Sequence, residues 1–477
     1  MSGPIIQVIV FALITLAIAF ATYLKCRTPR DHTDDDNKDY FLAGGTLNWV
    51  FIAGSITLTN LSTDQLVGMN GNQMPLLAWW ELAAVAGLIL LAYVFIPLYY
   101  KHQCTTTTEL LEKRLGGKAL RALISCLFLV GGLFIYLPIM LYTGSLFMIS
   151  MFDLNVPLIF IAIVFAIVGA AYAVFGGLRA VAVSDTYSGA GLLGLGLLVV
   201  FLAFQAIDFD LSGIPPDRLT MIGNNASPIP WHTLFTGMIF IQIFYWSFNQ
   251  TITQRAMAAP DVKEARKGIL AAAGIRLLIV PLIIAVPGVI SYKLYGDIGD
   301  AAYGRIVGDV LPTWLSGAFA AMMAAAVLTS FNSALNSAAA LYVCDIHEQF
   351  FEPNAHVRRI ATFMTIVFVG LALLLVPLYA QADSIINLVQ QLNGLLSMPI
   401  LSAFFVAIFF RDVSPWAAAA AVIAGTIGYG IVSFSFPQFH YIHAMFVTLL
   451  SCIALALFLN RVAFNRRAQF TLEDFRS

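Results

Sequence analysis

A cluster of polar side chains interrupts an apolar stretch near the start of the chain. Residues 55–71 read SITLTNLSTDQLVGMNG and include nine hydroxyl, amide or carboxylate side chains. Polar groups at membrane depth are tolerated only where they line a cavity or are buried in protein. Hydroxyls and amides both donate and accept hydrogen bonds, as the groups of a polar solute do. The stretch therefore predicts a broken membrane helix with a polar binding site beside it.

Four ionisable residues lie within otherwise apolar segments: Asp64, Glu81, Asp185 and Arg276. Charges at membrane depth are costly, so each is a functional-site candidate. Glu81 is either a structural carboxylate that satisfies a neighbouring helix or, as we favour, a hydrogen-bond acceptor for a polyhydroxylated ligand. Arg276 either enters the same site or extends to the cytoplasmic interface. Asp185 either caps a helix or holds a cation.

Hydroxyl side chains gather again in the segment AAAVLTSFNSALNSAAALYVCD. Thr329, Ser333 and Ser337 recur every four residues and so share one helix face. Small and hydroxyl residues also let membrane helices pack closely, which is the simpler interpretation of the lower half of this segment. Thr329 together with Ser330 instead predicts a sodium site, completed by backbone carbonyls from the break at 58–62.

The composition is that of a polytopic membrane protein. The 477 residues are 60% hydrophobic and 11% charged, with a mean hydropathy of +0.85, which is far from the averages of soluble domains. The net charge of −1 offers no basic field for nucleic acid, and the five cysteines show neither paired nor metal-ligand spacing. We expect the lipid bilayer, and not nucleic acid, to be the partner of its surface.

About 13 transmembrane helices are predicted from segments of about 20 apolar residues, so the fold class is an all-α polytopic membrane protein. The first span is expected to be a retained helix and not a signal peptide, because basic residues follow it instead of preceding it. The predicted spans are 4–24, 45–71, 75–100, 119–150, 156–177, 184–206, 231–254, 268–292, 313–344, 358–380, 383–410, 414–434 and 441–460.

The basic residues predict how the chain is oriented in the membrane. Of the 25 Lys and Arg residues, 21 fall in loops that an N-outside, C-inside arrangement places in the cytoplasm. Arg218, Lys293 and Arg305 fall outside, and Arg276 lies within a span. We expect a multi-pass protein of a cell inner membrane or plasma membrane, with the N-terminus outside and the C-terminus in the cytoplasm, functional as a monomer.

Two five-helix units contain most of the predicted spans. Residues 45–206 and 231–410 hold five spans each, and an odd number of spans forces the second unit into an inverted orientation. The predicted broken helices are the first of each unit, namely the stretch described above and FIQIFYWSFNQ at 240–250. The remaining parts are an N-terminal helix and cytoplasmic loop (1–44), an extracytoplasmic loop (207–230), and two peripheral helices with a cytoplasmic tail (411–477).

Several motifs follow one another in the order and spacing of a known family. They are YFLAGG (40–45), NLSTDQLVGMNG (60–71), GGLRAVAVSD (176–185), FYWSFNQTITQR (244–255), EARKGI (264–269), SFNSALNSAAALYVCDI (330–346) and QQLNG (390–394). Together they resemble the sodium:solute symporter family, specifically its bacterial sodium/sugar branch, over nearly the whole chain. The resemblance implies a LeuT-type core of two inverted repeats of five helices, in agreement with the count of spans.

The resemblance also implies a sugar site between the broken first helix and its neighbours. Gln65 and Glu81 would hydrogen-bond to sugar hydroxyls, and Gln390 would contact the sugar from the tenth core helix. Asn60 would pair with Tyr245, whose ring closes the site from the cytoplasmic side. Amides, carboxylates and aromatic rings suit a sugar, since each hydroxyl both donates and accepts.

A sodium site is implied beside it. Its ligands would be the backbone carbonyls of Leu58 and Leu61, the backbone of Ala326, and the hydroxyls of Thr329 and Ser330. Sodium (Na⁺) is therefore the expected coupling ion. Since one helix would hold both sodium and sugar, binding of either would favour binding of the other.

Three positions depart from the family pattern around the sugar. Arg276 stands where sugar-transporting relatives have a lysine, Ala84 where they have a small polar residue, and Gln242 where shorter polar residues are common. A guanidinium can bind a carboxylate through two hydrogen bonds, so the pocket is expected to favour a different sugar, such as an acidic one.

A second sodium site is left open by the sequence. Asp185 with Ser333 resembles part of such a site, but Asn332 replaces the hydroxyl that usually completes it. An amide oxygen can still ligate sodium, so both one and two ions per cycle stay under consideration.

These observations predict a sodium-coupled secondary active symporter that imports a sugar or sugar-like small-molecule solute by alternating access. A proton-coupled sugar or sugar-acid transporter is the main alternative, because Glu81 and Asp185 are titratable. A membrane sugar sensor is less favoured, since residues 461–477 contain no signalling module. An enzyme is not expected, because no pairing of a nucleophile with a base is visible.

Overall fold

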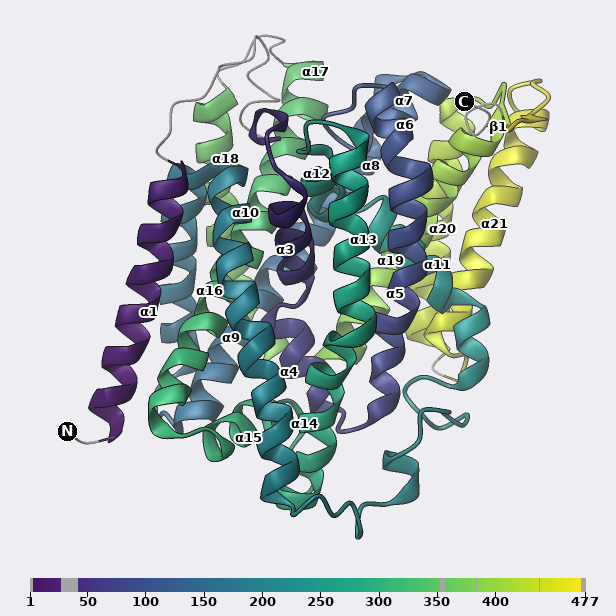
Figure 1. Cartoon of the computed structure of the whole chain (residues 1–477). Helices are drawn as coiled ribbons and strands as arrows, with labels where there is room; N and C mark the ends of the chain where they lie inside the picture. Colours follow the sequence, from purple (N-terminus) through teal and green to yellow (C-terminus); the bar gives the residue numbers. More distant parts are fainter. Residues whose placement is uncertain (1–2, 27–41, 352–356, 383, 437, 473–477) are drawn as a thin grey trace.

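The computed structural model is a bundle of membrane-length helices (Figure 1). Among the residues that the structure describes, ten helical segments are long and apolar enough to cross a membrane, and three shorter apolar segments, Trp49–Asn60, Leu158–Ala171 and Gly237–Ser247, accompany them. The all-α class is confirmed, while the number thirteen stays a prediction. The predicted N-terminal cytoplasmic loop lies largely outside the described residues. The described residues are 3–26, 42–351, 357–382, 384–436 and 438–472.

The elements that form the bundle follow in chain order. They are α1 (Gly3–Cys26), α3 (Trp49–Asn60), α4 (Thr63–Gly71), α5 (Trp79–Leu90), η3 (Leu91–Phe95), α6 (Ile96–Lys101), α7 (Glu109–Leu115), α8 (Lys118–Gly131), η4 (Gly132–Tyr136), α9 (Leu137–Phe152), α10 (Leu158–Ala206), α11 (Gly237–Ser247), α12 (Gln250–Met257), α13 (Val262–Leu278), α14 (Val280–Tyr295), α15 (Ala302–Val310), α16 (Thr313–Ala340), η8 (Leu341–His347), α17 (Glu348–Phe350), α18 (Val357–Tyr379), α19 (Ile385–Phe409), β1 (Phe410–Arg411), α20 (Pro415–Ser435), α21 (Tyr441–Val462) and β2 (Gln469–Phe470).

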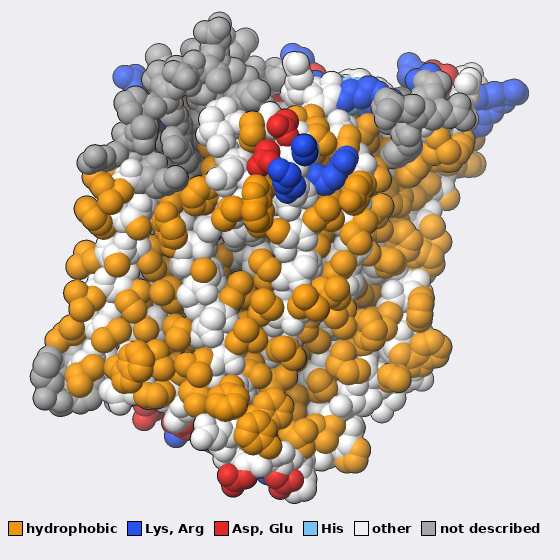
Figure 2. Space-filling model, viewed as in Figure 1, with side chains coloured by type: hydrophobic (Ala, Val, Ile, Leu, Met, Phe, Trp, Pro, Cys, Tyr) orange, Lys and Arg blue, Asp and Glu red, His pale blue; other side chains and the backbone are white. Residues whose placement is uncertain are grey.

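The outer surface matches a protein embedded in lipid. Apolar side chains cover the middle of the visible face, while most Lys and Arg side chains gather near its upper end, beside a few acidic ones, and further acidic side chains lie at its lower edge (Figure 2). Segments from the loops predicted on the basic side, such as α7 and β1, lie together at the upper end (Figure 1). α15 and the loop that precedes α11 lie at the lower end. The predicted grouping of the loops is thus reproduced by the fold.

Both predicted helix breaks are present. α3 ends at Asn60, Leu61 and Ser62 leave the helical conformation, and α4 begins at Thr63. α11 ends at Ser247, and α12 begins at Gln250 with the Asn249 side chain accepting from the Thr251 amide at 2.9 Å. Each break lies within a segment that the sequence predicts as one span.

The sequence predicts two separate helices, at 156–177 and 184–206, but the structure joins them in the single helix α10. Gly169 packs against Phe331 of α16, whereas Gly191 packs against Met322 of the same helix. A straight helix would separate these glycines by about 33 Å, but their partners are only about 14 Å apart along α16. α10 therefore does not run straight, and two arms of it pack on one helix. The side chains of residues 172–180, Arg179 included, lie outside the description.

A π turn places an aromatic side chain at the centre of the bundle. η4 lies between α8 and α9, and such turns are frequent at functional sites. Pro138 follows it and has no amide hydrogen for the carbonyl four residues earlier, that of Phe134. The hydroxyl of Tyr379 on α18 donates to this carbonyl instead. The irregular turn is thus satisfied by a neighbouring helix, and it ends at Tyr136 beside the cavity described below.

Gly87 lets α5 approach α11 closely. A Cβ atom at this position would lie 2.5 Å from the carbonyl oxygen of Gln242 and 3.0 Å from Cβ of Trp246. Small residues permit such backbone contact between membrane helices. The approach fixes where Gln242 and Trp246 stand relative to the carboxylate of Glu81, which lies on the same helix as Gly87.

We predict that Gly87→Ala destabilises the fold. The added methyl group cannot be accommodated without moving backbone, and overpacking of this kind costs about 1–3 kcal/mol. Thermal unfolding in detergent should show a lower Tm for this variant. Gly370→Ala on α18 is the matched control, because its Cβ meets no atom within 4 Å. Equal Tm values for the two variants would contradict the close approach.

Candidate functional site

The break between α3 and α4 exposes backbone oxygen atoms in the centre of the protein. The last four carbonyls of an α-helix have no partner within the helix, and here they include those of Leu58 and Asn60. Leu61 has φ −77° and ψ 59°, and Ser62 is extended with ψ 177°. The chain therefore crosses the break without continuing the hydrogen-bond ladder. Its free carbonyls are available to a ligand.

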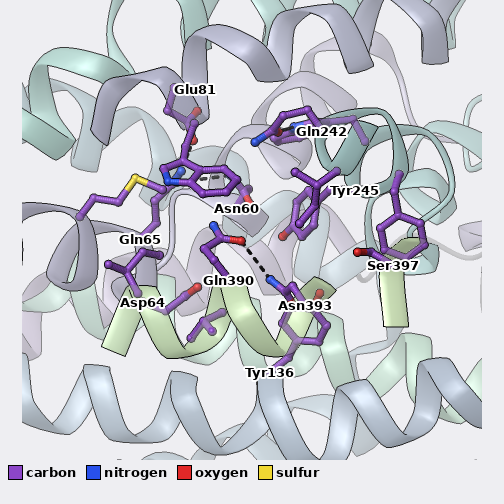
Figure 3. Close-up of a pocket in the computed structure, with 17 residues that line it drawn as sticks. Asn60, Asp64, Gln65, Glu81, Tyr136, Gln242, Tyr245, Gln390, Asn393 and Ser397 are labelled. Atoms are coloured by element: carbon purple, nitrogen blue, oxygen red, sulfur yellow. Dashed lines mark hydrogen bonds between the residues drawn. The ribbon is translucent and has the colours of Figure 1, made fainter. Parts of the chain in front are cut away.

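A polar cavity lies beside this break (Figure 3). Polar groups from four separate segments meet apolar and aromatic side chains in its wall. The lining residues are Asn60, Asp64, Gln65, Met69, Trp80, Glu81, Tyr136, Ile241, Gln242, Phe244, Tyr245, Trp246, Ile386, Val389, Gln390, Asn393 and Ser397. Six of the seven predicted solute-binding residues are among them, and Arg276 is not.

Glu81 and Arg276 form a fully buried ion pair. The guanidinium donates to Oε2 of Glu81, and the side-chain amide of Gln65 donates to Oε1. Arg276 also donates to the Thr57 carbonyl at 3.1 Å and lies 4.4 Å from the ring centroid of Trp246. The interpretation that Arg276 reaches the membrane interface is therefore wrong, since the residue is 0% exposed. The charge of each partner is compensated by the other.

Asn60 connects this ion pair to Tyr245, as the resemblance implied. With its amide nitrogen toward Tyr245, Asn60 donates to the tyrosine hydroxyl at 2.8 Å, and its oxygen accepts from Nη1 and Nη2 of Arg276 at 2.8 and 2.9 Å. This orientation satisfies both ends of the amide, which is the usual basis for assigning it. The last residue of α3 is thus held by contacts from α11 and α13.

Two further glutamines reach the cavity from other helices. Gln242 accepts from the indole nitrogen of Trp246 at 2.9 Å, which leaves its amide nitrogen free to donate to a solute. Gln390 on α19 accepts from Asn393 at 3.4 Å, the contact drawn as a dashed line in Figure 3. Both amides therefore keep unused hydrogen-bonding capacity at the cavity.

An oxygen cluster lies on the other side of the break, where α16 meets the end of α3. The hydroxyl of Ser330 lies 3.5 Å from the carbonyl oxygen of Thr59. Thr329 donates to the Ala325 carbonyl at 2.9 Å and lies 3.3 Å from that of Ala326. The structure thus brings the hydroxyls predicted for sodium next to the broken helix.

Two buried oxygen atoms at this cluster lie close to each other but make no hydrogen bond of good geometry within the described part of the chain. They are Oγ1 of Thr59 and Oδ1 of Asp185. The hydroxyls of Thr59 and Thr329 both lie close to the Asp185 carboxylate. Unpaired buried polar atoms are rare and call for an explanation such as a bound ion. Hydroxyl, carboxylate and carbonyl oxygens are ligands that suit a hard cation.

Asp185 is also connected to a buried arginine. Ser55 donates to Oδ2 of Asp185 at 2.7 Å and accepts from Nε of Arg255 at 2.9 Å, and Arg255 donates to Ser333 as well. Both charged residues are fully buried. Asp185 lies deep within α10 and not at its start, so the helix-cap interpretation is wrong. Asn332 makes no side-chain hydrogen bond to any residue that the structure describes.

Asp300 joins the ends of two helices that border the cavity. It accepts from the Ile385 amide at the start of α19 at 3.1 Å. A Cβ atom on Gly71, at the end of α4, would lie 2.4 Å from its Oδ1. Burial raises the pKa of Asp300 to about 6, since a carboxylate in a poorly solvated place favours its neutral form.

Sequence reasoning missed several residues of this site. Tyr136, Asn393 and Ser397 line the cavity, but a single polar residue in an apolar helix gives no signal of its direction. The sequence marks Asp64 as an intramembrane charge but does not indicate its role. Arg255 was counted only as a loop residue. Its burial depends on α12 packing against α3, which the sequence alone does not reveal.

Residues 40–425 match the model of the sodium:solute symporter family. The chain is 33% identical to the uncharacterized symporter YidK of Escherichia coli (strain K12), over 98% of this chain and 86% of that protein. It is 28% identical to the sodium/glucose cotransporter of Vibrio parahaemolyticus, over 88% and 83% of the two chains. It is 26% identical to the human sodium/myo-inositol cotransporter 2, over 89% and 69%.

Solved structures share the fold. A Na⁺-coupled sialic acid symporter in its substrate-bound outward-open state superposes with a TM-score of 0.80 at 17% identity, over 98% of this chain and 99% of that one. Mhp1, a nucleobase-cation-symport-1 family transporter, gives 0.60 at 17% identity, over 88% and 94%. MhsT gives 0.54 at 15% identity, over 91% and 100%. The fold is therefore of the LeuT type.

We predict that removing either member of the buried ion pair alone destabilises the protein. Glu81→Gln leaves the Arg276 guanidinium without its carboxylate, and such a loss costs about 3–5 kcal/mol. Combining it with Arg276→Met should restore much of the Tm measured in detergent. Lys267→Gln, which breaks the exposed pair with Glu264, is the control and should leave the Tm nearly unchanged. Additive losses in the double variant would contradict the pairing.

Proposed function

The chain belongs to the sodium:solute symporter family, and we propose that it imports a sugar or sugar-like polyol together with sodium. One observation supports this most strongly. The break between α3 and α4 borders the polar cavity on one side and the oxygen cluster of α16 on the other. A shared, irregular backbone segment can couple a solute site to an ion site.

The cavity is suited to a solute with many hydroxyl groups. The amides of Gln65, Gln242 and Gln390 and the hydroxyl of Tyr245 offer donors and acceptors in several directions. The apolar and aromatic wall can pack against the carbon faces of a ring. Two relatives are named for glucose and myo-inositol, which supports a polyol. The expectation of an acidic sugar loses its basis, because Arg276 is already neutralised by Glu81.

Sodium would bind where the break faces α16. We expect its ligands to be the carbonyls of Leu58, Leu61 and Ala326 and the hydroxyls of Thr329 and Ser330. The buried Oδ1 of Asp185 lies close to this group and would add negative charge. We therefore assign Asp185 to the first ion site, and one sodium ion per cycle follows.

A second ion is disfavoured by a positive charge within the protein. Arg255 donates to Ser333 and, through Ser55, is connected to Asp185. A sodium ion on Asp185 and Ser333 would have to share their oxygens with this guanidinium, and like charges in a buried site repel strongly. Asn332 would contribute no ligand in this arrangement.

A route toward the basic end of the bundle continues from the cavity. A second cavity shares Tyr136, Phe244, Asn393 and Ser397 with the first. It also borders Asn249, in the break between α11 and α12. Movement of the shared side chains would open one cavity into the other. With the predicted N-outside, C-inside orientation, this route leads to the cytoplasm of a monomeric transporter.

Proton coupling is the competing proposal. Glu81 and Asp185, the carboxylates proposed to titrate, are each connected to a buried arginine. Replacing sodium by choline at fixed pH, and then varying pH at fixed sodium, separates the two modes. Loss of uptake only in the second experiment would favour protons.

The proposed function is tested by uptake into proteoliposomes under an inward sodium gradient. Radiolabelled hexoses, myo-inositol and the corresponding sugar acids form the panel. We expect sodium-dependent accumulation of at least one neutral polyol. Accumulation of none of them, by a protein that still unfolds cooperatively, would contradict a polyol substrate.

We predict that Thr329→Ala and Ser330→Ala each raise the sodium concentration for half-maximal uptake at least several-fold. Each removes an oxygen from a small, dehydrated ion. The apparent affinity for the solute should fall in parallel because coupling is reciprocal. Ser316→Ala, at the far end of α16, serves as control. Unchanged sodium dependence in both variants would rule out this sodium site.

We predict a hyperbolic dependence of uptake on sodium, as expected for one ion. Asp185→Asn should raise the half-saturating sodium concentration while the curve keeps this shape, since the residue supports the same single site. A sigmoidal wild-type curve that becomes hyperbolic in Asp185→Asn would instead establish a second ion on this residue.

A further inference from the structure

Asp64 presents a carboxylate to the cavity from the first turn of α4. It is half-buried, lines the cavity and accepts a hydrogen bond from the hydroxyl of Ser62. In Figure 3 it stands near Gln65 and Gln390, on the side of the cavity away from Gln242. The residue follows the helix break directly, so its position is fixed by the same irregular backbone.

The charges around the cavity do not balance. Asp64 and Glu81 are the ionisable acids in its wall, and no Lys or Arg lines it. Glu81 is neutralised by Arg276. Asp64 forms no ion pair with a residue in the described part of the chain, and no cation acts on it electrostatically. Its nearest ionisable neighbours include the neutral phenols of Tyr136 and Tyr245.

Burial opposes the negative charge of Asp64 more strongly than any other single effect, and two features of the fold offset part of that cost. The N-terminus of a helix stabilises an anion through its free amides and its dipole. The Ser62 hydroxyl donates to the same carboxylate, and hydrogen bonds to a charged form stabilise it. A charge in a poorly solvated cavity acts strongly on whatever enters.

We propose that Asp64 makes the cavity selective for charge: it admits neutral polyols and polyols with a protonated amine, and it excludes polyols with a carboxylate. The proposal rests on the proposed function, because it assumes that this cavity holds the solute. It adds a specificity-determining residue opposite the pair formed by Glu81 and Arg276. The uncompensated carboxylate would repel an acidic group and attract an ammonium group placed within a few ångströms of it.

The test compares solutes that differ only in charge. Binding of glucose, glucosamine and glucuronate, and of galactose, galactosamine and galacturonate, is measured with purified protein in sodium at pH 7.5, by the rise in Tm with concentration. In the wild type we expect the uronate of a binding series to be at least about ten-fold weaker than the hexose, and the amine to equal or exceed the hexose. Asp64→Asn should bring the three apparent affinities together.

Asp64→Glu is the matched control, since it keeps the charge and should keep the order of the three solutes. Equal affinity for uronate and hexose in the wild type would overturn the proposal. So would an unchanged order in Asp64→Asn that folds with wild-type Tm and keeps its sodium dependence. A variant that loses sodium binding but keeps the order would assign Asp64 to the ion and likewise overturn it.

Failure of the proposed function gives a different result from failure of the charge selectivity. If neither sugar series binds, the polyol assignment fails, and the charge comparison is repeated with ethylene glycol, ethanolamine and glycolate, which need much less room than a hexose. A preference for ethanolamine over glycolate that disappears in Asp64→Asn supports the selectivity by charge alone. Absence of such a preference overturns it.

Discussion

Carbonyl groups without amide partners in the middle of a membrane are the constraint on which the rest of the structure depends. Lipid offers nothing to satisfy them, so the break at Leu61 and Ser62 must be surrounded by protein, ion or solute. Side chains from α16 and α13 meet it directly, through Ser330 on the Thr59 carbonyl and Arg276 on that of Thr57. The helices around the break are therefore arranged to complete its hydrogen bonds.

Buried charged residues are the second constraint on how the helices are arranged. Glu81 lies against Arg276, and Asp185 is connected through Ser55 to Arg255. Each pair ties different helices together, since a buried charge is tolerated only with a partner. The pairs also leave the surroundings of the break almost neutral. Asp64 is a carboxylate near the break that has no such partner in the described part of the chain. For this reason we propose that it acts on the charge of the solute.

Features that depend on local composition could be predicted from the sequence. Both helix breaks, the membrane class and the sodium-type hydroxyls of Thr329 and Ser330 follow from polar residues in apolar segments, and the structure contains the breaks where they were predicted. The ion pair of Glu81 and Arg276 could not be predicted, because its members are 195 residues apart and their contact depends on helix packing. The same holds for Arg255, whose place in the sequence is typical of a loop.

The side chains proposed to bind the solute already bind one another, and in the proposed function this would limit how tightly a solute can bind. Gln65 and Arg276 satisfy Glu81, and Asn60 satisfies Tyr245. A hydroxyl of the proposed polyol would have to replace these hydrogen bonds, so the net gain for each contact would be small. An ion bound to the α3 carbonyls would make this segment more rigid before the solute arrives. The solute would then lose less binding free energy in ordering the segment, so its affinity would rise. Modest intrinsic affinity, raised by the ion, is what a symporter needs in order to release its solute once sodium has left.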